Sequence, residues 1–296
     1  MKTLTHPGPA TQPRIRAVRA RSRGELRTLT PGALLQEELT ELAHELGEGS
    51  AYFELHGGLF TPVSYCTPGP STEERAMSFS SERGAATAHL VYGSGTVGYR
   101  HGAPFVHSHC LWMLPDGSLR GGHLWPETRS GVTAPTALFY GVQGATWVSS
   151  DDDETRMPVF TAYEEEEAMA ESPTIETTIA RILPGEDITL TVERVAREAG
   201  YQRAAVRGGL GSLVGGQLID PRNGLERSGE GPGTEVVALV GSVEPTAVGP
   251  RARLSCTMVD LHGELHAGEL VRGSNAVAVT FELILQNITP ATQPTN

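Results

Sequence analysis

The sequence predicts an α/β protein of the α+β type, with two tandem copies of one domain. Each copy is expected to have a mixed, mostly antiparallel sheet and one main helix. Three observations predict this fold class. The chain of 296 residues repeats itself over most of its length, and its 35 glycines and 20 prolines favour short strands joined by turns. Each repeat also contains one stretch with the apolar spacing of an amphipathic helix.

Four pairs of segments carry the repeat. The pairs are residues 29–47 with 182–200, 55–59 with 206–210, 89–97 with 236–243 and 103–124 with 249–270. The third pair is aligned through Gly93 and Gly241. The offset between partners falls slowly from 153 through 151 and 148 to 146, as small loop insertions would produce. Recurrence of one module indicates two units of the same fold, which we place at residues 25–150 (the first copy) and 174–288 (the second copy).

Each copy is expected to begin with a short strand, a Pro-Gly turn and a helix. Apolar residues follow the turn at intervals of three and four, as on one face of a helix. They are Leu34, Leu35, Leu39, Leu42 and Leu46 in the first copy, and Ile188, Val192, Val195 and Ala199 in the second. Gly47 and Gly200 are placed to end these helices, because glycine readily takes the left-handed conformation of a C-cap. Strands separated by glycine-rich turns complete each copy.

Charged segments flank the two copies. Residues 1–24 are rich in arginine, and residues 151–173 contain the acidic blocks Asp151–Glu154 and Glu164–Glu167. We expect the acidic segment to be a solvated linker. The arginine-rich segment is expected to be an extended edge or tail that balances the linker, with a nucleic-acid-binding arm as the alternative. Residues 289–296 are expected to form a tail.

The overall charge argues against two classes of partner. The chain has 23 basic and 35 acidic residues, a net charge of −12, which disfavours phosphate backbones and anionic membranes. No apolar run approaches the roughly 18 residues of a membrane span, and residues 1–16 lack the apolar core of a secretory signal. Three cysteines cannot build a disulfide framework. We therefore expect a cytoplasmic protein with no membrane partner.

Histidines gather in the first copy, and the sharpest group follows one predicted hairpin. His107 and His109 are two residues apart, so they point to the same face of a strand. A three-residue loop, Pro115–Gly117, places His123 directly opposite His109, with His107 diagonal to that pair. A two-residue Asp-Gly loop would instead place His123 opposite Cys110, on the other face.

With the three-residue loop, His107, His109 and His123 form the ligand set of an open divalent metal site, for which zinc is our first expectation. The alternative is three histidines that make ordinary hydrogen bonds on a polar sheet. The second copy has lost all three, because Arg253, Ser255 and Glu269 stand at the equivalent positions. Arg253 and Glu269 are expected to form an ion pair there, which predicts one metal ion per chain.

Other candidates are single residues near these motifs. His56 and His101 are candidate catalytic proton carriers, and Arg100 is a candidate contact for an anionic substrate. For each of them the alternative is an ordinary surface or turn residue. Cys110 and Cys256 occupy equivalent positions and are expected to be core residues, not nucleophiles.

Three motifs resemble those of the plants-and-prokaryotes-conserved (PPC) domain family. They are Ile182–Ile188, which reads Ile-Leu-Pro-Gly-Glu-Asp-Ile, the glycine-rich segment Gly208–Leu213, and the His-x-His and Gly-Gly-His pair of the hairpin. The resemblance covers both copies. It implies a compact α/β domain that usually associates as a trimer. In prokaryotic members it implies a metal site near a subunit interface, formed by the histidines that match His107, His109 and His123.

The sequence also departs from that family. Plant members carry AT-hook motifs that bind DNA, and this chain has none. Our first functional expectation is a metal-binding protein that acts on or senses a small, anionic molecule at the three-histidine site, with hydrolase or lyase chemistry if it is catalytic. One alternative is a DNA-associated regulatory protein. The other is a structural oligomer in which the metal only joins subunits. A homo-oligomer is expected, with a small molecule as the partner.

Overall fold

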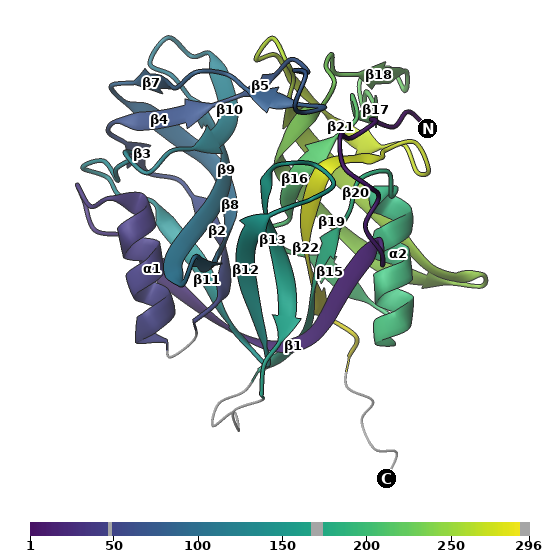
Figure 1. Ribbon diagram of the computed structural model, residues 1–296. Coiled ribbons are helices and arrows are strands. Elements are labelled where there is room, and N and C mark those ends of the chain that lie inside the picture. The colour runs from purple at the N-terminus through teal and green to yellow at the C-terminus, as the bar shows by residue number, and fades with distance from the viewer. Residues whose placement is uncertain (47–48, 167–173, 291–296) are drawn as a thin grey trace.

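The computed structural model describes residues 1–46, 49–166 and 174–290, and it confirms the predicted fold class. Each half of the chain has one helix against a mostly antiparallel sheet, and a single parallel pairing, between β8 and β12, makes the sheet mixed. The helices cover the outer faces of the two halves, and the inner faces of the sheets lie toward each other (Figure 1). No helix in the described part of the chain is long and apolar enough to cross a membrane.

Residues 1–166 contribute one helix and thirteen strands. They are β1 (Ile15–Thr28), α1 (Leu35–Glu45), β2 (Ala51–His56), β3 (Leu59–Phe60), β4 (Val63–Cys66), β5 (Pro68–Gly69), β6 (Ser78–Phe79), β7 (Arg83–Ala85), β8 (Ala88–Arg100), β9 (Ala103–Met113), β10 (Leu119–Leu124), β11 (Thr136–Gln143), β12 (Ala145–Asp151) and β13 (Pro158–Glu164).

Residues 174–290 contribute one helix and nine strands. They are β14 (Ile175–Ile182), α2 (Ile188–Ala199), β15 (Ala204–Val206), β16 (Leu210–Leu213), β17 (Gln217–Ile219), β18 (Glu226–Ser228), β19 (Thr234–Thr246), β20 (Gly249–Val259), β21 (Leu265–Leu270) and β22 (Val277–Asn287).

The strand pairings repeat between the halves. Strands β8, β9 and β10 form the same antiparallel meander as β19, β20 and β21, and each meander has a bulge at the equivalent place, between Leu90 and Tyr92 or between Val236 and Ala238. The register corrects one detail of the repeat. Ser108 pairs with Gly95, and its equivalent Leu254 pairs with Gly241, so Gly241 corresponds to Gly95 and not to Gly93. The offset is therefore 146 along both strands of this hairpin.

The two helices follow the apolar pattern. Leu35, Leu39 and Leu42 are buried on α1, and the apolar face of α2 is buried in the same way. The α2 helix ends as predicted, because Gly200 takes the left-handed conformation with φ of 76°. Gly47, the predicted end of α1, lies outside the described residues.

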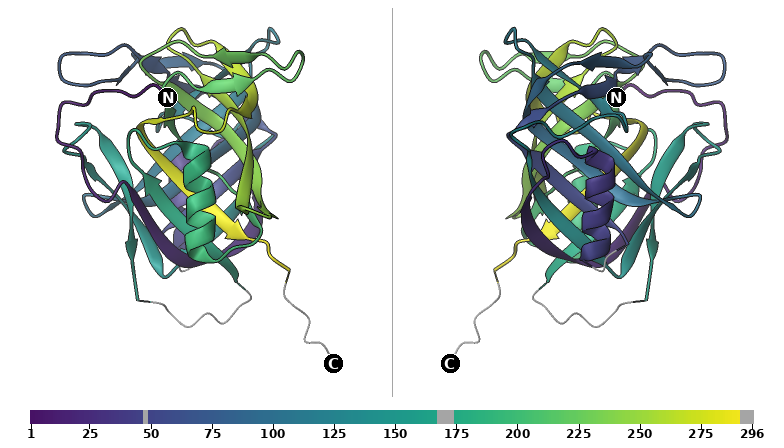
Figure 2. Two further views of the ribbon diagram at one scale, coloured as in Figure 1. Left: turned by 90° about the vertical axis from the view of Figure 1, so that its right-hand side faces the viewer. Right: turned by 90° about the vertical axis from the view of Figure 1, so that its left-hand side faces the viewer.

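The arginine-rich segment does not hang free as a tail. From Ile15 onward it is β1, which pairs with β14 through Ile15–Ser22 and with β11 through Arg21–Thr28. Val18 and Ser22 are buried on one side while the intervening residues are exposed or half-buried, so the segment has the alternation of a strand. One strand thus joins the sheets of both halves (Figure 2).

The acidic segment is also more structured than a solvated linker. Its residues from Pro158 to Glu164 form β13, which pairs with β12 and buries Val159 and Phe160. Asp152 and Glu154 are buried too, because each meets an arginine: Asp152 bonds Arg181 at 2.7 Å and Glu154 bonds Arg14 at 2.6 Å. The part of the acidic segment at residues 167–173 lies outside the described residues.

Four apolar cores result, one of which gathers Met77, Met157 and Val279. Each helix packs on its own sheet in one core, and a third core lies between the halves. That shared core contains Trp147 and Phe160 from the β12–β13 hairpin, Tyr52 from the first half, and Ile179 and Ile284 from the second. The inner faces of the two halves therefore form one continuous interior, and the histidine hairpin lies on it.

Candidate metal centre

The hairpin between β9 and β10 has the predicted register. The Leu114 N–H donates to the Ser118 carbonyl at 2.9 Å, and Gly117 takes a left-handed φ of 81°. The loop is thus Pro115–Gly117, and His109 lies directly opposite His123. The two-residue loop is excluded.

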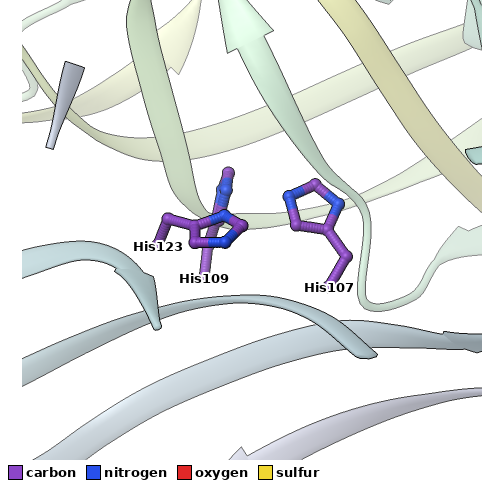
Figure 3. A group of neighbouring side chains, drawn as sticks. All are labelled: His107, His109 and His123. Atoms are coloured by element: carbon purple, nitrogen blue, oxygen red, sulfur yellow. The ribbon is translucent and has the colours of Figure 1, made fainter. Parts of the chain in front are cut away.

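The three histidines converge. Their potential ligand nitrogens all lie within 4.8 Å of one another, and the ring centroids are 4.9 to 5.4 Å apart. Figure 3 shows the three rings gathered around one space. His109 is buried, whereas His107 and His123 are partly exposed. The donor set suits zinc and other divalent ions that accept imidazole ligands.

The second copy fixes the orientation of two of these rings. The Nδ1 of His107 lies 2.6 Å from Oε1 of Glu282, and the Nδ1 of His109 lies 2.8 Å from the Val236 carbonyl. A carbonyl only accepts hydrogen bonds, so Nδ1 of His109 carries the proton and its Nε2 keeps a lone pair. Such partners behind the ring are typical of metal-ligating histidines.

The surroundings of His109 and His123 favour neutral rings. Burial, together with the neighbouring His107 and His123, lowers the pKa of His109 well below its usual value. Burial and then His107 lower the pKa of His123 to about 3. The Nδ1 of His123 is also enclosed without a hydrogen-bond partner. Unprotonated nitrogens aimed into one space are what a metal ion requires, so the residues present fit the ion.

Two buried carboxylates of the second copy complete the surroundings. Besides Glu282, Glu235 places its Oε1 3.8 Å from Nε2 of His109, and its Oε2 has no hydrogen-bond partner. Burial raises the pKa of Glu235 to about 8. Sequence reasoning missed both residues. The available signal was a glutamate inside each of two apolar strands, where charged residues seldom occur without a partner.

A cavity of about 190 Å³ opens beside the histidines. Its polar lining includes the three histidines, both glutamates and Arg100, whose guanidinium lies 5.6 Å from the centroid of the Phe105 ring and 3.8 Å from the Asp151 carboxylate. The remaining walls are largely apolar, with Met77, Phe79, Met157, Val159, Phe160 and Val279 among them. Of the three further candidates, His56, Arg100 and His101, only Arg100 is therefore brought to the site.

His56 and His101 do not reach the cavity. His56 is exposed at the end of β2 against the Tyr92 ring, and it does not line the cavity. His101 is exposed in the turn between β8 and β9 with φ of 52°. Strand β9 begins at Ala103, and its four steps to His107 span about 13 Å. The register of the hairpin thus keeps His101 away from the cluster.

The equivalent place in the second copy holds the predicted ion pair. Arg253 bonds Glu269 at 2.9 Å, and Ser255 lies opposite Glu269 on the neighbouring strand. Within the described residues, His107, His109 and His123 are the only cluster of this kind that could hold a metal ion.

Comparison with known proteins matches one part of the chain to a family model. Residues 169–289 match the model of the Plants and Prokaryotes Conserved (PCC) domain. No curated protein matches the chain.

Several solved structures are similar to parts of it. A metal-containing protein from Archaeoglobus fulgidus aligns over 54% of this chain and 99% of its own, at 20% identity and a TM-score of 0.39. A plant- and prokaryote-conserved protein from Pyrococcus horikoshii aligns over 48% and 96%, at 17% identity and a TM-score of 0.39. A candidate DNA-binding protein from Ralstonia eutropha aligns over 46% and 88%, at 19% identity and a TM-score of 0.38.

Proposed function

We propose that this chain, in which residues 169–289 are identified as a Plants and Prokaryotes Conserved domain, binds one divalent metal ion. A small anionic molecule would bind beside the ion. His107, His109 and His123 would hold the ion, and zinc suits them best. One observation carries the proposal: three imidazoles converge on the wall of one cavity.

The cavity suggests the nature of the second ligand. Its volume of about 190 Å³ suits a molecule of a few heavy atoms, and Arg100 contributes a positive charge to the lining. The apolar walls would receive a hydrocarbon portion. When bound, a metal ion with an open position polarises a ligand oxygen or lowers the pKa of bound water. Hydrolase or lyase chemistry stays a prediction, because His56 and His101 do not line the cavity.

The test is metal analysis of the purified protein after loading with zinc and removal of excess ion. We expect one equivalent per chain in the wild type and less than a tenth of that in His109→Ala. His266→Ala is the matched control, since that histidine lies in the second copy beside Asp260, and it should keep one equivalent. Zero equivalents, or two, in the wild type would overturn the proposal.

A further inference from the structure

We infer that Glu235 of the second copy is the fourth ligand of the metal ion held by the three histidines of the first copy. This inference rests on the proposed function. If Glu235 is a ligand, the second copy contributes directly to the metal site and is more than a structural scaffold.

Glu235 reaches the histidines because its strand, β19, packs closely against the sheet of the first copy. That strand contacts β8, β9 and β10. A Cβ atom on Gly121 would lie 3.2 Å from Cγ1 of Val237, so the missing side chain lets β19 approach β10 closely. The Val236 carbonyl meets the back of the His109 ring. Glu235, one residue earlier, is thereby held beside the ligand nitrogen of the same ring.

The distance suits a shared ion. Two ligands that each lie about 2.1 Å from a tetrahedral zinc ion are about 3.4 Å apart. Oε1 of Glu235 is 3.8 Å from Nε2 of His109. Coordination by Glu235 would require its side chain to turn from this position toward the ion shared by the three histidines.

The burial of Glu235 calls for a cation. Its side chain is 2% exposed, and Oε2 has no hydrogen-bond partner. A carboxylate in such a place is costly unless a positive charge balances it. A divalent ion among the histidines supplies that charge, and both carboxylate and imidazole belong to the ligands that zinc accepts.

The two copies divide the ligands between them. In the repeat, Glu235 corresponds to His89 of the first copy, which is exposed and bonds the Gly58 carbonyl. The histidine positions of the first copy correspond to Arg253, Ser255 and Glu269 in the second. The first copy therefore has the imidazoles without the acid, and the second has the acid without the imidazoles. One complete centre per chain follows from this division.

The test is the zinc affinity of Glu235→Gln, measured by competition with a chromophoric chelator. Glutamine keeps the volume and removes the charge, so we expect the fold to survive and the affinity to fall by about 100-fold or more. Glu235→Asp, which keeps the charge on a shorter side chain, should lose less. Glu269→Gln is the matched control, because that glutamate lies in an exposed ion pair of the same copy.

A second measurement uses Co²⁺, whose visible absorption reports the number of ligands. We expect the spectrum of Glu235→Gln to differ from that of the wild type, with Glu269→Gln unchanged. Equal zinc affinity and equal spectra in wild type and Glu235→Gln would overturn the inference and leave the proposed function intact. Absence of zinc binding by the wild type would overturn both. Circular dichroism of the metal-free variants shows whether each is folded.

Discussion

At the scale of single residues, the candidate site depends on what stands behind each imidazole. The Val236 carbonyl fixes the proton of His109 on Nδ1, and Glu282 holds His107 at 2.6 Å. A ring fixed in this way loses little rotational freedom when it binds an ion, and a carboxylate behind it makes the ligand nitrogen more basic. Glu282 is therefore a positioning residue for His107.

This role predicts the effect of Glu282→Gln. The amide can still accept a hydrogen bond from His107 but lacks the charge, so zinc affinity should fall by about 10- to 100-fold while the stoichiometry stays at one. Competition titration measures the affinity. Glu282→Asp, which keeps the charge, separates this role from a structural one, since it should retain more of the zinc affinity than Glu282→Gln. An unchanged affinity in Glu282→Gln, or an equal loss in Glu282→Asp, would show that the charge of Glu282 does not act through His107.

At the scale of the elements, a hairpin and an ion pair hold the site against the second half. The β12–β13 hairpin contributes Val159 and Phe160 to the cavity wall, and Asp152 in its turn bonds Arg181 of β14. Both charged side chains are at most 6% exposed. Breaking a buried pair leaves the other charge without compensation, which is far more costly than the loss of a surface pair.

Asp152→Asn should therefore lower the free energy of unfolding by about 3 kcal/mol at pH 7. Urea unfolding followed by circular dichroism measures this value. Asp153→Asn, at the exposed neighbouring position, is the control and should change it by no more than about 0.5 kcal/mol. A loss of less than about 1 kcal/mol in Asp152→Asn would contradict the argument.

The same pair predicts a dependence on pH. Burial alone would raise the pKa of Asp152, but Arg181 and Thr155 hold it below its ordinary value. The folded state then binds fewer protons than the unfolded state, so the stabilisation is complete above about pH 4 and is lost as the pH falls through the lowered pKa. The difference in stability between wild type and Asp152→Asn should shrink as the pH falls from 5 toward 2. A constant difference over that range would contradict the assignment.

At the scale of the whole molecule, β1 joins the two halves, and the proposed metal centre would join them as well. β1 pairs with strands of each half, and the candidate ligands come from β9 and β10 on one side and β19 on the other. An ion that binds only the folded chain stabilises it by about 2.7 kcal/mol at a free concentration one hundred times Kd.

Saturating zinc should accordingly raise the midpoint of thermal unfolding by about 5 °C or more, with both halves melting in one transition. Differential scanning calorimetry tests this, and a chelator should reverse the shift. His109→Ala is the control, and zinc should leave its unfolding midpoint unchanged. If zinc stabilised only one of two separate transitions, the centre would not join the halves.

The distribution of charge gives a prediction about DNA. The net charge is −12, and the arginine-rich segment is a strand of the sheet from Ile15 onward instead of a free arm. We expect no binding of duplex DNA at about 150 mM salt, because affinity for the backbone requires neutralisation of phosphates. Fluorescence anisotropy with labelled duplex measures it. Salt-dependent binding that Arg19→Ala with Arg23→Ala weakens would instead favour the DNA-associated alternative.

The sequence by itself determined what depends on local pattern. The apolar spacing of the helices, the Pro115–Gly117 loop and the alternation of His107 and His109 fix local backbone geometry, so the hairpin and its three histidines could be predicted. The repeat likewise indicated two copies of one fold, and the loss of histidines in the second copy indicated a single three-histidine cluster.

Only the tertiary structure decided what faces the histidines. Glu235 and Glu282 lie more than a hundred residues from them in the chain, and no local rule relates such positions. The acidic segment was misjudged for the same reason: charge alone predicts exposure, whereas Asp152 and Glu154 are buried because distant arginines neutralise them. Local physics sets an element and its register, and the packing of the two copies against each other decides which buried charges meet.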